Sequence, residues 1–184
     1  MITATQLVQI YGITNAKAKV WVPYIDAALT FAQCDTTQRA ACFLAQVGHE
    51  SGRLRYLREI WGPTKQQLRY EPGTTLATKL GNVEPGDGLR YLGRGLIQTT
   101  GRDNYAMTTV KLRKYMDCPD FEHGPVLLET KNWGSISAAL FWREKGLNRF
   151  ADAQDFSGLT KKINGGYNGL ADRQALYTRA LFVL

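Results

Sequence analysis

The sequence predicts a mainly α-helical protein that carries one long, loop-rich insertion. Apolar residues recur at helical spacing in several segments of the 184-residue chain, which is typical of amphipathic helices. By contrast, glycine and proline interrupt residues 62–88 so often that no periodicity persists there. The chain is 44% hydrophobic and 21% charged, as expected of a soluble globular protein, and no apolar stretch approaches the ~20 residues of a transmembrane helix.

The first third of the chain contains three expected helices. The first covers residues 5–11 and stops at a glycine. Pro23 suits the first turn of the second helix, because its fixed φ is compatible with a helix start. Thr36 or Thr37 can cap the third helix, which carries Phe43 and Val47 at helical spacing and ends near Gly52.

The middle of the chain is expected to be mostly loop. Residues 62–88 form a long loop, and a loop of that length inside a compact domain is usually functional or disordered. Residues 89–100 have a short β character. Helical patterns then return over 103–115, over 133–145 with Asn132 as the cap, over 157–163 and over 170–183.

Positive charge is concentrated in one segment. Residues 51–115 hold 12 basic and 5 acidic residues, whereas the rest of the chain holds 11 of each. A basic segment attracts polyanions, so nucleic acid and a polyanionic cell wall are both candidate partners, and a solvated basic face without a partner is a third possibility. No nucleic-acid-binding motif is visible.

The cysteine pattern predicts neither disulfides nor a metal site. The chain has three cysteines, without a Cys-x-x-Cys pair or a Cys/His cluster, so we expect reduced thiols and no zinc site. The N-terminal residues lack the basic and apolar regions of a signal peptide. We therefore expect a protein that is made and kept soluble in the cytosol and that another factor releases.

Glu50 is the first candidate catalytic residue. It shares the apolar face of the helix that carries Phe43 and Val47, and it lies in the last turn, where the helix dipole disfavours an anion. Both effects favour the protonated carboxyl that a general acid requires. A glutamate that merely caps the helix is the alternative. His49 does not begin a zinc-binding His-Glu-x-x-His helix, because position 53 is an arginine.

Glu59 is the second candidate. It follows the break at Gly52, and Arg53, Arg55 and Arg58 precede it, which favours an ionised carboxylate. One neutral acid and one ionised base form the pair used in glycoside hydrolysis. Taken alone, Glu59 fits a surface ion-pair partner better than a catalytic base, and the presence of Glu50 shifts the balance toward catalysis.

Three motifs together resemble family 19 glycoside hydrolases. The first is FLAQVGHESG at 43–52, the second is YLGRGLIQTTGRDNY at 91–105, and the third is INGG at 163–166 followed by ADR at 171–173. They occur in the family's order over roughly residues 36–183. The resemblance implies a lysozyme-like, two-lobed α-helical fold with a small β-hairpin and a substrate cleft, and an inverting mechanism without metal or cofactor.

The resemblance also implies roles for individual residues. Glu50 matches the general acid and Glu59 the general base, at the short spacing of the bacterial and phage branch. Thr100 matches a residue that helps to hold the attacking water. Arg173 matches an arginine that organises the catalytic carboxylates. The remaining matched or neighbouring positions are assigned to substrate binding: His49, Trp61, Gln98, Asn104, Tyr105 and Asn164.

Structural alternatives stay open for these positions. Gln98 could satisfy a strand end, Asn104 could start a helix, and Asn164 could end one. Tyr105 could belong to the core as readily as to the cleft. Arg173 could instead pair with Asp172 or Asp155. Trp61 and Tyr70 could stack on sugar faces or pack within the loop.

The expected protein is a single catalytic domain over residues 1–184. Its helical lobe covers about 1–52 and 101–184, and its loop and β insertion covers about 53–100. The basic segment favours peptidoglycan, which is polyanionic, over neutral chitin. We therefore expect a monomeric phage endolysin that cleaves the β-1,4 bond between N-acetylmuramic acid and N-acetylglucosamine. A separate holin-type protein would release it from the host cytoplasm to the periplasm and cell wall, without stable membrane insertion.

Three alternative functions make different predictions from those of a peptidoglycan hydrolase. A chitinase of the same fold would differ in its substrate. A non-catalytic glycan-binding module would keep the groove, although both carboxylates are present. A nucleic-acid-binding protein would lose affinity steeply with salt, and none is expected here.

Overall fold

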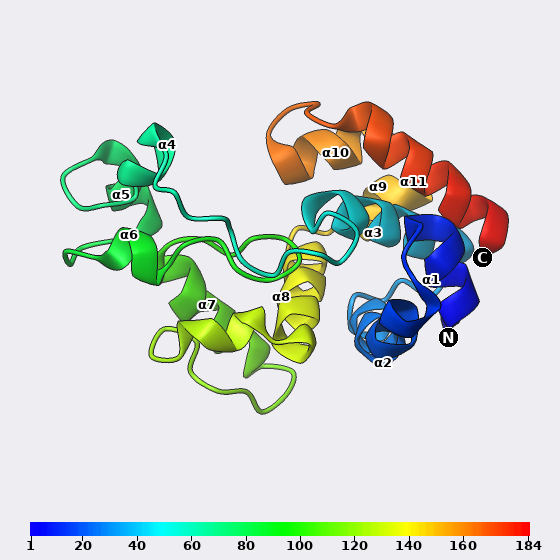
Figure 1. Ribbon diagram of the computed structural model, residues 1–184, viewed down its shortest axis with the longest axis horizontal. Helices are drawn as coiled ribbons and strands as arrows, with labels where there is room; N and C mark the ends of the chain where they lie inside the picture. Colours follow the sequence, from blue (N-terminus) through cyan, green and yellow to red (C-terminus); the bar gives the residue numbers. More distant parts are fainter. The chain divides into compact units, whose positions relative to one another are not determined.

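The computed structural model describes residues 1–184 and is built almost entirely of helices (Figure 1). The chain forms two compact units: the first unit comprises Met1–Arg55 and Ala138–Leu184, and the second unit comprises Tyr56–Ser137. The first unit contains α1 (Ala4–Tyr11), α2 (Asn15–Phe31), α3 (Thr37–Glu50), α9 (Asn148–Asp152), α10 (Phe156–Asn164) and α11 (Leu170–Val183). The second unit contains α4 (Lys65–Leu68), α5 (Thr75–Leu80), α6 (Asp87–Arg90), α7 (Arg102–Leu112) and the 3₁₀ helix η1 (Pro125–Glu129), and α8 (Lys131–Glu144) runs from the second unit into the first.

Helix α3 is the centre of the first unit. It packs most extensively against α11 (Figure 1), and its residues from Ala41 to Gly48 are all buried. The Phe43 ring lies 5.2 Å from the Trp142 ring, edge to face. A helix that is buried on nearly every side is held by its neighbours, so its C-terminal end is a fixed point for the residues that follow.

Local capping explains where α1 and α3 begin and end. Gly12 closes α1 in the left-handed conformation, as predicted. Of the two candidate caps for α3, Thr36 is the cap, and its side chain accepts a hydrogen bond from the amide of Arg39. Helix α3 ends at Glu50, close to the predicted break at Gly52.

Two predicted helix starts are wrong. Helix α2 begins after Thr14, whose hydroxyl accepts from the amide of Lys17, and Pro23 lies inside the helix. The helix continues past the proline because tertiary burial of Trp21 and other apolar residues stabilises it. Asn132 lies within α8 rather than at its cap, and the hydroxyl of Thr130 instead accepts from the amide of Trp133.

The prediction of a long loop over 62–88 is also wrong, because this segment forms α4, α5 and α6. These helices are four to six residues long, which is too short to show helical periodicity in a sequence. Thr64 and Thr74 cap α4 and α5 with their hydroxyls. Side-chain capping therefore organises a segment whose hydrophobic pattern is weak.

The predicted β-hairpin is reduced to two isolated bridges and forms no named strand. Arg94 pairs with Arg58 and with Thr99, both antiparallel. Arg94 and Thr99 exchange backbone hydrogen bonds of 3.0 and 2.7 Å. Between them, Gly95 has a φ of +85°, a conformation that glycine adopts without strain, so the chain turns at once.

The second unit extends further along the chain than the insertion expected over 53–100. Helix α7, which had been grouped with the helical lobe, packs into this unit: the ring of Tyr105 lies 5.4 Å from the ring of Tyr91. The hydroxyl of Thr109 accepts a 2.8 Å hydrogen bond from the amide of Phe121. The first contact joins α7 to the preceding segment, and the second joins α7 to the residues that follow it.

The three cysteines are free and buried. Burial raises the pKa of the Cys34 thiol and raises that of Cys42 to about 12. Burial also raises the pKa of Cys118. No helix is both long enough and apolar enough to cross a bilayer.

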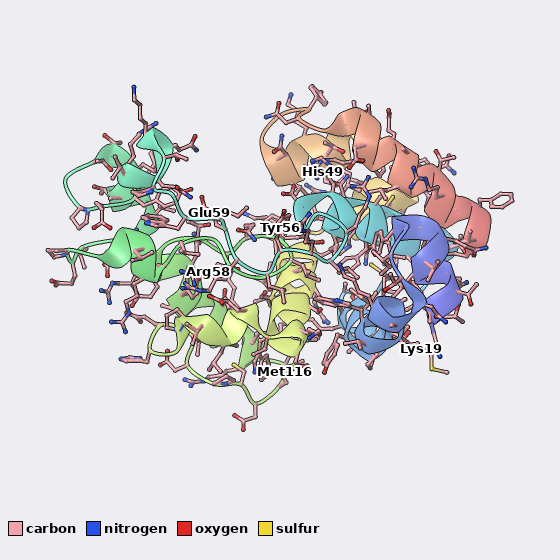
Figure 2. The ribbon with its side chains drawn as sticks, in the orientation of Figure 1. Lys19, His49, Tyr56, Arg58, Glu59 and Met116 are labelled. Carbon is pink, nitrogen blue, oxygen red and sulfur yellow. The ribbon has the colours of Figure 1, made fainter.

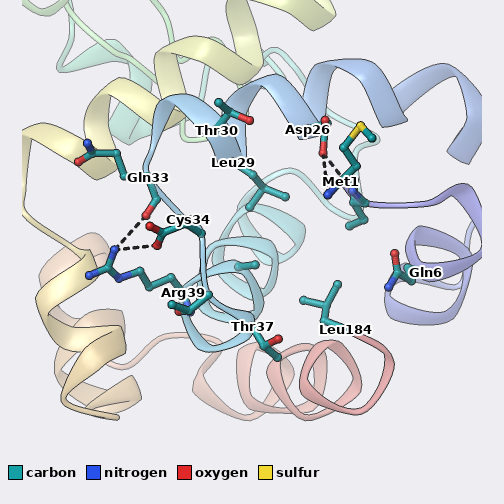
Figure 3. Close-up of a pocket in the computed structure, with 14 residues that line it drawn as sticks. Met1, Gln6, Asp26, Leu29, Thr30, Gln33, Cys34, Thr37, Arg39 and Leu184 are labelled. Atoms are coloured by element: carbon teal, nitrogen blue, oxygen red, sulfur yellow. Dashed lines mark hydrogen bonds and ion pairs between the residues drawn. The ribbon is translucent and has the colours of Figure 1, made fainter.

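A cavity of about 590 Å³ lies in the first unit beside α2 and the start of α3 (Figure 3). Arg39 is on its wall and donates to Asp35 at 2.9 Å. Asp26, also on the wall, accepts from the amide of Ile2 at 3.0 Å. None of the predicted site residues lines this cavity.

Candidate functional site

Glu50 is the last residue of α3, and its carboxyl group is partly exposed. The side chain is 23% exposed, and its Oε1 accepts a 2.6 Å hydrogen bond from Nη2 of Arg173. The other oxygen, Oε2, accepts no hydrogen bond within the first unit. Glu50 is therefore anchored through one of its two carboxyl oxygens.

The guanidinium of Arg173 is buried, with only 1% of the side chain exposed. Besides Glu50, it donates to Oε1 of Gln46 at 2.5 Å and to the carbonyl of Asn168 at 3.2 Å. Gln46 in turn donates to the hydroxyl of Thr160 at 2.9 Å. Arg173 thus joins α3, α10 and α11 in one buried polar network that fixes the position of the Glu50 carboxyl.

The structure decides between the partners considered for Arg173. Asp155 caps α10 by accepting from the amide of Gly158, and Asp172 binds other groups, so neither pairs with Arg173. Within the first unit, the carboxylate partner of Arg173 is Glu50.

His49 belongs to a second polar cluster beside Glu50. Its Nδ1 lies 2.7 Å from Oδ2 of Asp172, and Nη2 of Arg53 lies 2.5 Å from Oδ1 of the same carboxylate. Burial raises the pKa of Asp172, but the hydrogen bonds from His49 and Arg53 outweigh it and leave that pKa below its ordinary value. Asp172 is therefore an ionised link between two residues of the α3 terminus.

Asn164, the last residue of α10, lies in the same unit. Its Nδ2 is buried and has no hydrogen-bond partner. Gly165 follows it in the left-handed conformation and ends the helix, as predicted. The residue thus has a structural position at a helix end, together with an unsatisfied donor of the kind that is rare in folded proteins.

Glu59 lies in the second unit, on the irregular segment between α3 and α4 (Figure 2). Both of its carboxylate oxygens are bound: Oε1 accepts from Nε2 of Gln67 at 2.9 Å, and Oε2 accepts from the amide of Gly93 at 3.1 Å. The amide of Glu59 also donates to the carbonyl of Gly93 at 2.8 Å. Burial and the neighbouring Glu59 carboxylate together raise the pKa of Tyr70.

Two of the three arginines expected around Glu59 bind other carboxylates. Arg53 pairs with Asp172 in the first unit, and Nε of Arg58 lies 3.8 Å from a carboxylate oxygen of Glu129. Glu59 is instead held by neutral donors, an amide side chain and a backbone N–H. Glu59 therefore has a well-defined position that does not depend on Arg53 or Arg58.

Gln98 and Thr100 lie next to the backbone that binds Glu59. A Cβ atom at Gly93 would collide with Oε1 of Gln98 and lie 3.2 Å from the hydroxyl of Thr100. Gln98 donates to the carbonyl of Gly95 at 3.1 Å, and Thr100 donates to the carbonyl of Gln98 at 3.0 Å. The structure therefore brings Glu59, Gln98 and Thr100 together around Gly93.

Trp61, Asn104 and Tyr105 differ in their exposure. Asn104 is exposed and donates to the carbonyl of Thr100 at 2.7 Å. Trp61 is half-buried, and its ring centroid is 6.3 Å from that of Tyr70. Tyr105 is fully buried, and its hydroxyl donates to the carbonyl of Leu92 and accepts from Arg94. A direct sugar contact by Tyr105 is therefore wrong, and the core alternative holds.

Gln46, Gln67, Thr160 and Asp172 belong to these clusters but were not among the predicted site residues. Gln67 had a detectable signal, because Thr64 and Gln67 have the spacing of a capping box. The amide group of Gln67 completes that box and also reaches Glu59. Asp172 was visible only as the neighbour of Arg173.

Each unit presents one of the two predicted catalytic carboxyl groups, fixed by hydrogen bonds. Glu50, His49, Asn164 and Arg173 belong to the first unit, whereas Glu59, Trp61, Gln98, Thr100, Asn104 and Tyr105 belong to the second. No three His, Cys, Asp or Glu side chains gather in a way that could hold a metal ion. The functional groups of these residues are carboxyl groups, amides and hydroxyls, together with the guanidinium of Arg173 and the imidazole of His49.

Comparison with known proteins gives consistent results. No family model matches the chain. A glycosyl hydrolase family 19 domain-containing protein of Haemophilus influenzae is 35% identical over 182 residues, covering 86% of each chain. An endochitinase of Arabidopsis thaliana is 31% identical over 147 residues, covering 78% of this chain and 46% of that relative.

Solved structures show the same fold. Chitinase C from Streptomyces griseus superposes with a TM-score of 0.73 at 20% identity, covering 99% of this chain and 91% of that one. A bacterial family 19 chitinase superposes with a TM-score of 0.68, also at 20% identity, covering 99% and 94%. The predicted mainly α-helical, lysozyme-like fold class is confirmed.

Proposed function

Because the chain belongs to glycosyl hydrolase family 19 and is a glycoside hydrolase, we propose that its substrate is peptidoglycan. The scissile bond is the β-1,4 bond between N-acetylmuramic acid and N-acetylglucosamine. The reaction inverts the configuration at the anomeric carbon and uses no metal or organic cofactor.

In the proposed reaction, Glu50 is the general acid. Its Oε2, which has no hydrogen bond within the first unit, carries the proton to the glycosidic oxygen as the bond breaks. Arg173 holds Oε1 at 2.6 Å and keeps the carboxyl group in one orientation. After the transfer, the same contact stabilises the carboxylate that forms.

Glu59 is the proposed general base. It removes a proton from a water molecule that approaches the opposite face of the sugar ring, and Thr100 helps to hold that water. An inverting reaction requires the two carboxyl groups to be ~6.5–9.5 Å apart in the working enzyme. Gln67 and Gly93 orient Glu59 through its two oxygens.

The choice of polymer depends on the excess of positive charge within residues 51–115, which contain 12 basic and 5 acidic residues. Arg94 and Arg102 are engaged by acidic residues of the second unit. Other basic side chains of the segment are exposed, among them Lys65, Arg69, Lys79, Arg90 and Lys114. Peptidoglycan carries free carboxylates on its stem peptides, so such a surface favours it over neutral chitin.

This substrate suits a phage endolysin that lyses the host cell. The enzyme acts as a monomer in the cell wall or periplasm, and a separate holin-type protein gives it access. Chitin remains the alternative polymer, because the named relatives include chitinases.

The test is fragment analysis by mass spectrometry of purified peptidoglycan after digestion by the wild type and by Glu50→Gln. We expect disaccharide-containing fragments from the wild type and a rate lower by at least ~10²-fold for the variant. In a turbidity assay on permeabilised Gram-negative cells, the wild type should likewise clear the cells faster than Glu50→Gln. Cleavage of chitin oligosaccharides without any effect on cell walls would reverse the choice of polymer.

The same variant tests whether the protein acts by catalysis. If Glu50→Gln cleared cells at the wild-type rate, a non-catalytic glycan-binding role would replace hydrolysis. Glutamine preserves the size of the side chain and can accept the hydrogen bond from Arg173, so a loss of activity reports the loss of the proton.

A further inference from the structure

We propose that Asp172 is a positioning residue for the reaction: it fixes His49 and the turn after Glu50, and thereby holds the general acid in place. The proposal rests on the proposed function in one respect, namely that Glu50 is the acid. Asp172 itself is not expected to touch the substrate.

The first support is a double pairing between α3 and α11. His49 and Glu50 are consecutive at the end of α3, and Asp172 and Arg173 are consecutive near the start of α11. His49 pairs with Asp172 at 2.7 Å and Glu50 pairs with Arg173 at 2.6 Å. Exchanging partners would place the carboxyl groups of Glu50 and Asp172 together, so the register of the two helix ends is specified.

The second support concerns the turn after Glu50. Gly52, Arg53 and Leu54 have φ values of +57°, +60° and +60°. The left-handed conformation is unfavourable for a non-glycine residue, so Arg53 and Leu54 are strained. Such a turn persists only where its surroundings determine it strongly.

Several hydrogen bonds hold this left-handed turn. The amide of Arg53 donates to the carbonyl of Gly48 at 2.7 Å, and Nζ of Lys17 donates to the carbonyl of Arg53 at 3.1 Å. Nη2 of Arg53 also donates a 2.5 Å hydrogen bond to Asp172, which connects this turn to α11. Because one carboxylate binds both His49 and Arg53, it restrains the chain immediately before and shortly after Glu50.

The third support is the fixed orientation of the His49 ring. An ionised carboxylate can only accept, so Nδ1 of His49 carries the hydrogen in this contact. Gly169 lies against the ring, and a Cβ atom at that position would collide with it. The ring is thus held between Asp172 and the backbone at Gly169, with no room to rotate freely.

The test compares Asp172→Ala and Asp172→Asn with the wild type, using soluble peptidoglycan fragments or, if only chitin is cleaved, chitin oligosaccharides. We expect kcat to fall by about 10-fold in Asp172→Ala, because small misplacements of a catalytic group are costly, with KM changed less than twofold. Asp172→Asn keeps an acceptor for His49 and should recover much of kcat.

Asp152→Ala is the matched control. Asp152 lies in the same unit and accepts two 2.7 Å hydrogen bonds from Arg39. Its removal should lower the melting temperature about as much as the removal of Asp172, without lowering kcat. A further variant, His49→Phe combined with Asp172→Ala, should be no slower than the slower single variant if both residues act through one contact.

The proposal is overturned if kcat of Asp172→Ala stays within twofold of the wild type, or if Asp152→Ala lowers kcat equally. Glu50→Gln in the same assay distinguishes a failure of the positioning role of Asp172 from a failure of the assignment of Glu50 as the acid. If it is inactive while Asp172→Ala is unaffected, only the positioning role fails. If Glu50→Gln keeps the wild-type kcat, the assignment of the acid fails, and the role of Asp172 fails with it.

Discussion

Arg173 reaches Glu50 from the interior of the first unit, with Nη2 2.6 Å from Oε1 of the carboxyl group. The same guanidinium binds Gln46 and the carbonyl of Asn168. The proposed acid is therefore held by the buried core rather than by a mobile surface side chain. A buried cation of this kind depends on its carboxylate partner, because an unpaired charge in the interior is costly.

Replacing Arg173 should damage both stability and activity. Arg173→Ala leaves the Glu50 carboxyl without its partner and Gln46 without a donor, so we expect the free energy of unfolding to fall by about 3 kcal/mol. Arg173→Lys keeps the charge but loses the fork geometry, and it should recover stability more than kcat. Urea unfolding and turnover measure the two effects. Equal kcat values for the wild type and Arg173→Lys would contradict the importance of the orientation.

Gln67→Ala should loosen Glu59. The side chain of Gln67 is buried and donates to both Glu59 and the carbonyl of Ile60. Its loss should lower the free energy of unfolding by about 1–3 kcal/mol and lower kcat more than it changes KM. Gln66→Ala, on the exposed face of the same helix, is the control and should leave both quantities unchanged. A Gln67→Ala enzyme with normal kcat would show that Glu59 needs no such support.

Acid should destabilise the protein partly through Asp87. Burial raises the pKa of this carboxyl, but hydrogen bonds from Arg102 and from the amides of Glu84 and Val83 outweigh it and lower the pKa below its ordinary 3.8. A lowered pKa in the folded state stabilises the protein above the unfolded-state value. This contribution is lost as the pH falls from about 3.8 through the folded-state pKa.

The measurement is the free energy of unfolding between pH 2 and 6 for the wild type and Asp87→Asn. The wild type should be the more stable protein at pH 6, and the difference should shrink as the pH falls. A difference that does not depend on pH would mean that Asp87 contributes by packing and hydrogen bonding alone.

Gly48→Ala should destabilise the first unit. A Cβ atom at Gly48 would collide with the ring of Tyr11, which is buried and donates to the carbonyl of Leu44 at 2.8 Å. The ring cannot move away without breaking that bond. The net loss should be about 1–3 kcal/mol, even after the gain of about 1 kcal/mol in helix propensity. Gly62→Ala, where no atom lies closer than 4.0 Å, should change the melting temperature little.

Signals that act over a few residues could be predicted from the sequence. Gly12 ends α1 and Thr36 begins α3 because caps depend on local hydrogen bonds. Glu50 was expected at a helix end on a largely apolar face, and it lies there. Pro23 misled the prediction of α2 because tertiary burial overrides a local preference.

Partners that are distant in sequence could not be predicted. Arg173 and Glu50 are separated by 123 positions, so only the fold decides that they pair. The short helices α4 and α6 contain four residues each, which gives no periodic signal. The Thr64–Gln67 capping box is visible in the sequence, but the hydrogen bond from Gln67 to Glu59 depends on how the folded loop brings the two side chains together.

The burial of Cys34, Cys42 and Cys118 gives the enzyme built-in reporters of unfolding. A thiol with a raised pKa and little exposure reacts slowly with maleimides or disulfide reagents until the surrounding structure opens. Cys34 and Cys42 belong to the first unit and Cys118 to the second. Mass spectrometry after brief alkylation would therefore time the opening of each unit in the natural chain, without introducing any label.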